Sequence, residues 1–159
     1  MHRILQLLPE IAVGERQNFV RRTVTKAGYD ESVAAELLAL TGHPEMQFLF
    51  AAGGLSEVPI MAPIGELGIT ISGRIDRLIL RANEIIAVDY KTDRNWPSAA
   101  SAIRPEYLLQ MASYQSALKG IHPGQMVRCA ILWTAAPALM DIPDPLLAQA
   151  LVHNGVARP

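Results

Sequence analysis

The chain has 159 residues, of which 50% are hydrophobic and 18% are charged, and its formal net charge is -1. This length and composition predict a single globular domain, and the near-neutral charge excludes a general electrostatic attraction to nucleic acid or acidic membranes. No apolar run is as long as the roughly 18 residues of a membrane-spanning helix, and no secretory signal pattern is present, so we expect a cytoplasmic protein with no membrane partner. The lone Cys129 excludes an internal disulfide and is expected to lie in the core.

The first third of the chain predicts helices. A first helix carries His2 and stops near Pro9, and its apolar pattern is already running at residue 2, which suggests that further sequence precedes it. Gly28 ends the second helix and Asp30 caps the third. The expected helices are residues 1–8, 14–27, 30–40 and 44–51. We group them as an N-terminal helical unit, residues 1–52.

Three strands should follow. Residues 56–61 form the first, with Glu57 near its start and Pro59 implying an edge or a bulge. Residues 69–80 and 85–91 form the second and third, because both runs are rich in β-branched and aliphatic residues on either side of a polar break. Their faces are largely apolar, so we expect the sheet to be covered on both sides.

The hairpin between the second and third strands brings polar residues together. If Ala82 and Asn83 form a two-residue loop, Asp76 stands directly opposite Asp89. The period of two then puts Lys91 on the face of the two aspartates and Tyr90 on the other face. Opposed carboxylates need solvent to separate them or a divalent cation to join them, and oxygen ligands of this kind suit Mg²⁺ or Mn²⁺.

The rest of the chain predicts a helix and a parallel strand. Residues 105–119 read as a helix ended by Gly120, and residues 126–134 as an apolar strand that should run parallel to the third. A short edge strand at 138–142 and a closing helix at 144–152 complete the pattern. The expected fold is therefore α/β, with a catalytic sheet and helix at 55–134 and a C-terminal segment at 135–159.

Three short motifs carry a family resemblance. They are Gly73-Arg74-Ile75-Asp76, Asp89-Tyr90-Lys91, and the run from Gln110 to Tyr114. Together they resemble the G-x-x-D, D-x-K and Q-x-x-x-Y motifs of the RecB-type branch of the PD-(D/E)xK nuclease superfamily, whose core is restriction-endonuclease-like. The whole chain is further similar to the C-terminal nuclease domain of the AddA subunit of bacterial AddAB helicase-nucleases, because residues 1–9 match its H-R-x-L-Q-x-L-P segment and residues 56–59 its acidic first strand.

The resemblance implies roles for individual residues. It implies a Mg²⁺ site, with Mn²⁺ as a substitute, formed by Asp76, Asp89, His2 and the carbonyl of Tyr90. Lys91 would orient or deprotonate the attacking water or offset phosphate charge, and which of these it does stays open. Glu57 would bind a metal through water, and Gln110 and Tyr114 would position the substrate or the ligands. Arg74 and Arg94 are candidate phosphate contacts, with Arg77 less certain.

The implied activity is that of a metal-dependent DNA exonuclease domain in a helicase-nuclease that repairs double-strand breaks. DNA would be the substrate, a helicase motor would lie upstream in the same polypeptide, and an AddB-like subunit would be the partner. This chain has no G-x-x-x-x-G-K-[ST] loop, so we expect no ATP site in it. Two alternatives stay open: an inactive nuclease-like module for DNA binding or assembly, and an unrelated metal-dependent hydrolase.

Overall fold

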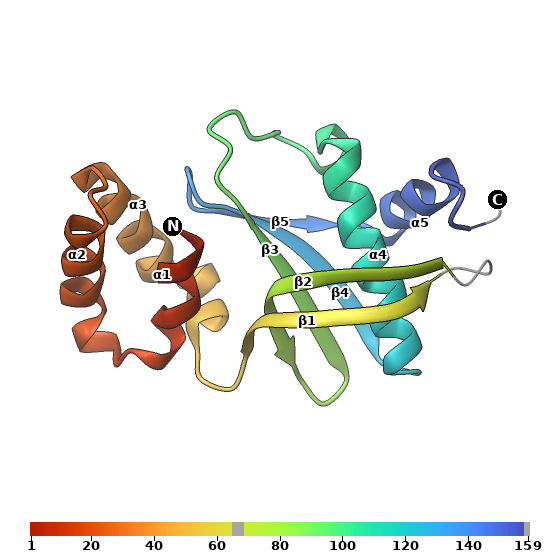
Figure 1. Ribbon diagram of the computed structural model, residues 1–159, viewed down its shortest axis with the longest axis horizontal. Coiled ribbons are helices and arrows are strands. Elements are labelled where there is room, and N and C mark those ends of the chain that lie inside the picture. The colour runs from red at the N-terminus through yellow and green to blue at the C-terminus, as the bar shows by residue number, and fades with distance from the viewer. Residues whose placement is uncertain (65–68, 158–159) are drawn as a thin grey trace.

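The structure is a computed structural model, and it describes residues 1–64 and 69–157. One five-stranded sheet, ordered β1-β2-β3-β4-β5, lies between two groups of helices (Figure 1). The strands are β1 (Leu55–Ile64), β2 (Ile69–Leu80), β3 (Glu84–Lys91), β4 (Met126–Trp133) and β5 (Ala138–Ile142). The α-helices are α1 (His2–Leu7), α2 (Arg16–Lys26), α3 (Glu31–Gly42), α4 (Pro105–Ile121) and α5 (Asp144–His153). Short 3₁₀ helices are η1 (Leu8–Glu10), η2 (Val13–Glu15), η3 (Pro44–Phe50) and η4 (Ala100–Ala102).

The strand directions confirm the predicted α/β fold. β1, β2 and β3 are antiparallel, α4 crosses over from β3, and β4 returns parallel to β3. This is the restriction-endonuclease-like order, with the additional helices at the N-terminal end of the chain. Some bounds differ from the sequence expectation: β1 extends to Ile64, α4 continues through Gly120 to Ile121, and the helix expected at 44–51 is the 3₁₀ helix η3.

Two hydrophobic clusters cover the two faces of the sheet, as the apolar strands predicted. On one face, α4 and α5 pack through residues such as Met111, Leu118 and Leu147 against Leu78 and Ala87. On the other face, α1, α2, α3 and η3 pack against Ile79, Ile86, Val88, Tyr90 and Leu132. Both faces of the sheet are therefore buried, one under α4 and α5 and the other under the N-terminal helices.

The face assignment of β2 changes beside Asp76. A strict period of two would put Ile75 and Ile79 on one face, but Ile75 packs in the cluster under α4, whereas Ile79 packs under the N-terminal helices. On the neighbouring strand β1, the residue level with Asp76 is Glu57, and its backbone is left-handed with φ of 54°. Such a residue rotates the strand locally, so the alternation of faces changes phase across it.

Arg77 is a structural residue in this fold. Its side chain is fully buried and donates to the carbonyls of Leu49 (2.7 Å), Ala51 (2.8 Å) and Gly54 (2.9 Å), and to Ser56 Oγ (3.0 Å). The interpretation of Arg77 as a phosphate contact is therefore wrong, because its donors are already used to join η3 to the start of β1. Burial lowers the pKa of this guanidinium, and neutral oxygens rather than a carboxylate hold it.

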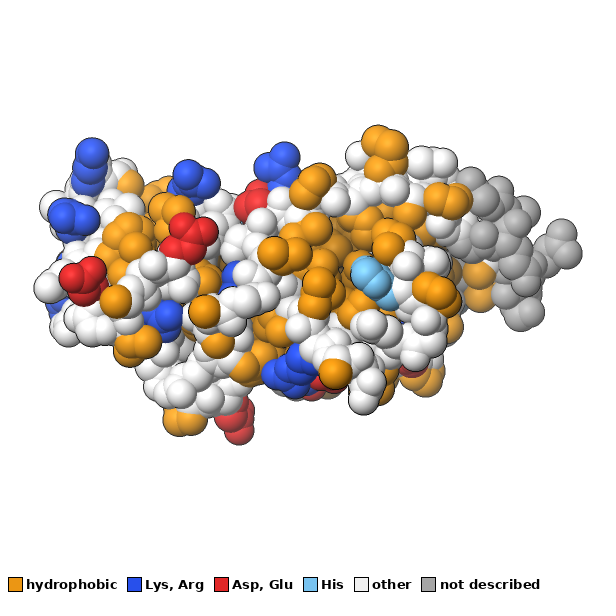
Figure 2. All heavy atoms as spheres, turned by 90° about the horizontal axis from the view of Figure 1, so that it is seen from below, with side chains coloured by type: hydrophobic (Ala, Val, Ile, Leu, Met, Phe, Trp, Pro, Cys, Tyr) orange, Lys and Arg blue, Asp and Glu red, His pale blue; other side chains and the backbone are white. Residues whose placement is uncertain are grey.

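β1 forms one edge of the sheet. β1 is the first strand in the sheet order and contains Pro59 and Pro63, in agreement with the edge position predicted from Pro59. On the face seen from below, hydrophobic side chains gather over the middle of the molecule, and several basic side chains lie at the end formed by α2 and α3 (Figure 2). No helix in the described part of the chain is long and apolar enough to cross a membrane.

Candidate active site

The two aspartates lie on adjacent strands in the expected register. Arg77 pairs with Val88 and Leu78 with Ala87, and the N–H of Arg81 bonds to the carbonyl of Glu84, so Ala82 and Asn83 form the turn. The ladder ends at Arg77 and Val88, and Asp76 and Asp89 are the next residues on the two strands. Asp76 Oδ2 accepts a 2.7 Å hydrogen bond from the N–H of Tyr90, which fixes the carboxylate against the backbone of β3.

His2 reaches this pair from α1, which belongs to the group of N-terminal helices. Its Nε2 lies 2.8 Å from the carbonyl oxygen of Tyr90 and 3.7 Å from Asp76 Oδ2. The carbonyl can only accept, so Nε2 carries a proton in this arrangement. His2 is therefore brought to the two groups with which it was expected to share a metal.

Lys91 occupies the opposite side of Asp89. Its Nζ lies 2.7 Å from Asp89 Oδ2, donates to Gln110 Oε1 at 3.0 Å, and stands 4.2 Å from the centre of the Tyr107 ring. The approach to Asp89 is close but poorly angled, since that buried oxygen has no hydrogen bond of good geometry among the described residues. We therefore treat the Lys91–Asp89 contact as an ion pair.

Gln110 and Tyr114 link the lysine to β2. Gln110 Nε2 donates to Tyr114 Oη at 3.1 Å. Tyr114 Oη in turn donates to the carbonyl of Arg74 (2.9 Å) and accepts from its N–H (3.3 Å). Both residues lie one helical turn apart on α4, so the Q-x-x-x-Y spacing places them on one face.

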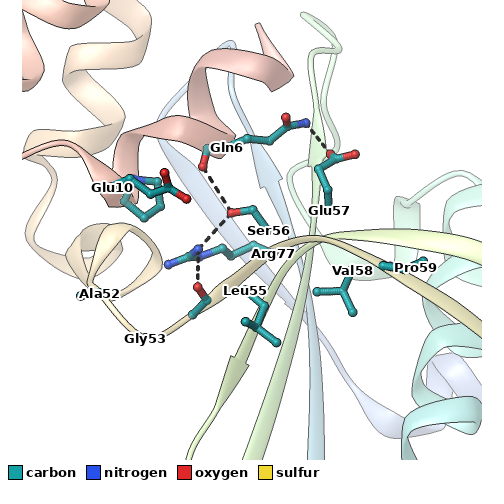
Figure 3. A pocket seen from close by; sticks show the side chains of 12 residues that line it. Gln6, Glu10, Ala52, Gly53, Leu55, Ser56, Glu57, Val58, Pro59 and Arg77 are labelled. Atoms are coloured by element: carbon teal, nitrogen blue, oxygen red, sulfur yellow. Dashed lines mark hydrogen bonds between the residues drawn. The ribbon is translucent and has the colours of Figure 1, made fainter.

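Glu57 joins the N-terminal helices to the sheet. Its Oε1 accepts from Gln6 Nε2 at 2.5 Å (Figure 3). Its Oε2 lies 3.1 Å from Arg74 Nη1. Gln6 lies one turn after His2 on α1, so the carboxylate holds the helix that carries the histidine. A left-handed glutamate is strained, and strained backbone is found most often at functional sites.

A cavity of about 810 Å³ opens behind Glu57 (Figure 3). It lies between α1, η1 and the start of β1, and its polar lining residues are Gln6, Glu10, Ser56, Glu57 and Arg77. It does not include Lys91, Asp76 or Asp89, so it borders the candidate site rather than containing it.

The predicted phosphate contacts lie apart. The Arg74 side chain is 65% exposed and pairs with Glu57, so it remains able to reach a ligand in solvent. Arg94 is exposed on the loop between β3 and α4, outside the network of Lys91 and Gln110.

Sequence reasoning missed Tyr107 and Gln6. Tyr107 lies between two cations, with Lys91 Nζ at 4.2 Å and the Arg104 guanidinium at 4.4 Å from its ring centre. Tyr107 precedes Gln110 by three residues on α4, so the two share a face of the helix. This spacing was the only sign in the sequence, because a tyrosine in an apolar helix usually only packs. Gln6 lies in the segment that carried the family resemblance, but it was not assigned a role.

Burial changes the acidity of both aspartates. It raises the pKa of Asp76 to about 6, the N–H of Tyr90 opposes this rise, and the nearby charge of Asp89 adds to it. Burial also raises the pKa of Asp89, while the ion pair with Lys91 opposes the shift. Two adjacent carboxylates with raised pKa values attract a positive charge more than isolated ones do.

The donor set fits a divalent cation. Carboxylate, imidazole and carbonyl groups are the ligand types present: His2 lies beside Asp76 and the Tyr90 carbonyl, and the neighbouring Asp89 has a buried Oδ2 without a hydrogen bond. Among the described residues, no three His, Cys, Asp or Glu side chains already form a compact metal-holding group. In this arrangement His2 bonds to the Tyr90 carbonyl, and Lys91 pairs with Asp89.

Comparison with known proteins agrees with this geometry. Residues 2–143 match the family model described as the PD-(D/E)XK nuclease superfamily. A search of curated proteins found no match. Among solved structures, a protein named "Putative exonuclease" from Eubacterium rectale superposes with a TM-score of 0.52 at 13% identity, covering 94% of this chain and 63% of its own. A second, named SSO0001, has a TM-score of 0.45 at 18% identity, covering 96% of this chain and 72% of its own.

Proposed function

Because the chain belongs to the PD-(D/E)XK nuclease superfamily, we propose that it is a magnesium-dependent deoxyribonuclease that hydrolyses phosphodiester bonds of DNA. The observation that carries the proposal is the placement of Lys91. Its ammonium is held between Asp89 and Gln110, at the end of the sheet where His2 and Asp76 also meet. A cation fixed beside a buried carboxylate is an arrangement for handling a phosphate and a water, and core packing does not require it.

Hydrolysis needs a water positioned for attack, neutralised charge on the phosphate, and help for the leaving oxygen. PD-(D/E)XK nucleases generally use divalent metal ions, and here Asp76, Asp89, His2 and the Tyr90 carbonyl would hold one. When bound, Mg²⁺ supplies Lewis acidity toward water and phosphate oxygens. For His2 to act as a ligand through Nε2, its proton must move to Nδ1 and its bond to the Tyr90 carbonyl must open.

The remaining residues position the reacting groups. The Lys91 ammonium donates toward the water or toward a phosphate oxygen, and its hydrogen bond to Gln110 Oε1 holds it in position. Tyr114 ties Gln110 to the backbone of β2. Glu57, through Gln6, holds the helix that carries His2, and this is the role we propose for it in addition to water-mediated metal contact.

At a finer level, we propose that the chain acts as the exonuclease domain of an AddA-type helicase-nuclease in DNA repair. The H-R-x-L-Q-x-L-P-like segment at residues 2–9 supports this, because it supplies both His2 and Gln6 to the site. The chain spans 63% of the length of the first structural neighbour. A helicase motor in the same polypeptide and an AddB-like partner belong to the same proposal.

The test is direct. Linear single-stranded DNA is incubated with the protein and Mg²⁺, Mn²⁺ or EDTA, and the products are resolved on a denaturing gel. Cleavage that requires the metal supports the nuclease, whereas DNA binding without cleavage under every condition would favour the inactive binding module. End-labelling at each terminus distinguishes stepwise removal of nucleotides from internal cuts.

A further inference from the structure

A small second pocket lies close to Lys91. Its volume is about 270 Å³, and it is formed by the loop between β3 and α4 together with the end of β4. Its lining residues are Asp93, Asn95, Pro97, Ala102, Arg104 and Trp133. Tyr107 connects it to the lysine, since its ring lies 4.2 Å from Lys91 Nζ and its hydroxyl donates to Asp93 Oδ2 at 3.1 Å.

Trp133 is the aromatic residue that lines this pocket, and two further rings, which are not part of the lining, pack against it. Trp96 stacks on Trp133 with ring centroids 6.4 Å apart and planes 26° from parallel, and Tyr107 lies 6.3 Å from Trp133. Trp133 is 1% exposed, and its indole N–H has no hydrogen-bond partner among the described residues. A buried donor left unpaired in a pocket wall is unusual, and a ligand that accepts from it would complete the site.

The polar groups of the pocket are mixed in sign and in hydrogen-bonding type. Arg104 contacts Asp93 and Tyr107 through a single nitrogen of its guanidinium, which has five N–H donors in all. Asp93 offers only acceptors, and Asn95 offers both donors and an acceptor. A phosphate would meet repulsion from Asp93, whereas the edge of a nucleobase presents donors and acceptors together and matches this set.

Size points the same way. Pockets for drug-sized ligands have volumes of roughly 300 to 1,000 Å³, so this one suits a single ring system. We propose that it is a subsite for one nucleobase of a single DNA strand, next to the phosphate that Lys91 addresses. This inference rests on the proposed nuclease function. The base would lie beside Trp133, and the polar groups of Asn95 and Arg104 would contact its edge.

The probe is a single strand that is abasic at every position except one, which carries 2-aminopurine. Such a strand can slide until its only base meets the pocket, so the measurement does not depend on a fixed register. Binding is measured in EDTA, which separates it from metal-dependent cleavage. We expect about tenfold tighter binding than for the fully abasic strand, as for a single stacked base, and quenching of 2-aminopurine fluorescence by the tryptophans.

Variants assign the effect to the pocket. Asn95→Ala changes an exposed loop residue and Trp96→Ala a half-buried one, and in both we expect the gain from the single base to fall below about threefold. Arg81→Ala is the matched control, because this half-exposed residue lies in the turn before β3 and lines no part of the pocket, so the full gain should persist. Asn95→Ala keeps the test valid if Trp96→Ala fails to fold.

The outcomes separate the two proposals. A single-base gain that disappears in Asn95→Ala supports the subsite, even for a protein that never cuts DNA. Equal binding of the abasic and single-base strands, or a gain that survives in both variants, overturns the subsite, even for a protein that cuts normal DNA with Mg²⁺.

Discussion

The ring of Tyr114 occupies the space that a side chain on Gly73 would need. A Cβ built on Gly73 would lie 2.8 Å from Tyr114 Cε1 and 2.9 Å from its hydroxyl oxygen. That close approach lets the hydroxyl bond both backbone groups of Arg74. The glycine of the G-x-x-D motif and the tyrosine of the Q-x-x-x-Y motif are thus two halves of one contact between β2 and α4.

Gly73→Ala should therefore displace Tyr114 and destabilise the protein by about 1 to 3 kcal/mol, since the added methyl meets a packed ring. Urea unfolding measures the loss. Gly120→Ala is the control, because Gly120 lies in α4 with open space around it and should be stabilised by about 0.5 to 1 kcal/mol. Equal stability of Gly73→Ala and the wild type would show that the Tyr114 ring can move aside at no cost in stability.

Lys91→Ala should reduce cleavage by at least about a hundredfold while the fold is kept, because the side chain lies at the end of a strand and makes polar contacts. Turnover of labelled DNA and far-ultraviolet circular dichroism measure the two effects. Lys119→Ala removes a lysine from a surface pair with Asp144 and should leave turnover unchanged. Normal cleavage by Lys91→Ala contradicts the assignment of the site.

Glu57→Gly should be more stable than Glu57→Ala by about 1 kcal/mol, because only glycine adopts a φ of 54° without strain. Both variants lose the carboxylate, so their difference isolates the backbone. At Ser72, an exposed position on β2, the order of the two substitutions should reverse. Thermal unfolding of the four proteins gives both differences, and the same order at both positions would argue against backbone strain at Glu57.

Asp76 should make the metal-free protein less stable as the pH rises from about 4 to 6. Its folded pKa is about 6, above the ordinary 3.8, so in this interval the folded state keeps a proton that the unfolded chain loses. The contribution is fully present below pH 4 and is lost above pH 6, with an upper size of about 3 kcal/mol. Urea unfolding in EDTA should show this slope in the wild type relative to Asp76→Asn, and parallel curves would disprove it.

Arg77→Ala should destabilise the protein by about 3 to 5 kcal/mol, because three carbonyls and the Ser56 hydroxyl lose a buried donor. Arg77→Lys should recover only part of this loss, since an ammonium cannot span the same acceptors. Arg22→Ala, on the exposed side of α2, should have little effect on unfolding. A mild Arg77→Ala phenotype with weakened DNA binding would restore the phosphate interpretation.

The hairpin was predictable because its determinants are local. Two apolar runs separated by a polar break fix the turn at Ala82-Asn83, and the turn fixes the register of every pair on the strands. The parallel strand followed from the length of the α4 crossover. The sequence alone thus places Asp76 and Asp89 next to the last pair of this ladder, whereas their roles remain a prediction.

Other features depend on contacts that no local pattern reveals. The phase shift at Ile75 follows from the left-handed backbone of Glu57, which nothing in the sequence of β1 indicates. Arg77 alternates with apolar residues as an exposed arginine would, and only η3, distant in sequence, provides the carbonyls that bury it. Tyr107 shows its cationic neighbours only once β3 and α4 are packed together.

The prolines of β1 also affect how this sheet meets other molecules. Pro59 and Pro63 are four residues apart, so their nitrogens face the same side of the strand, which in an edge strand is the side away from its partner. A strand from another copy would find two missing donors there and could not complete a ladder. The long outer strand thus resists edge-to-edge aggregation, and the opposite edge, β5, offers only Ala138–Ile142 as a template.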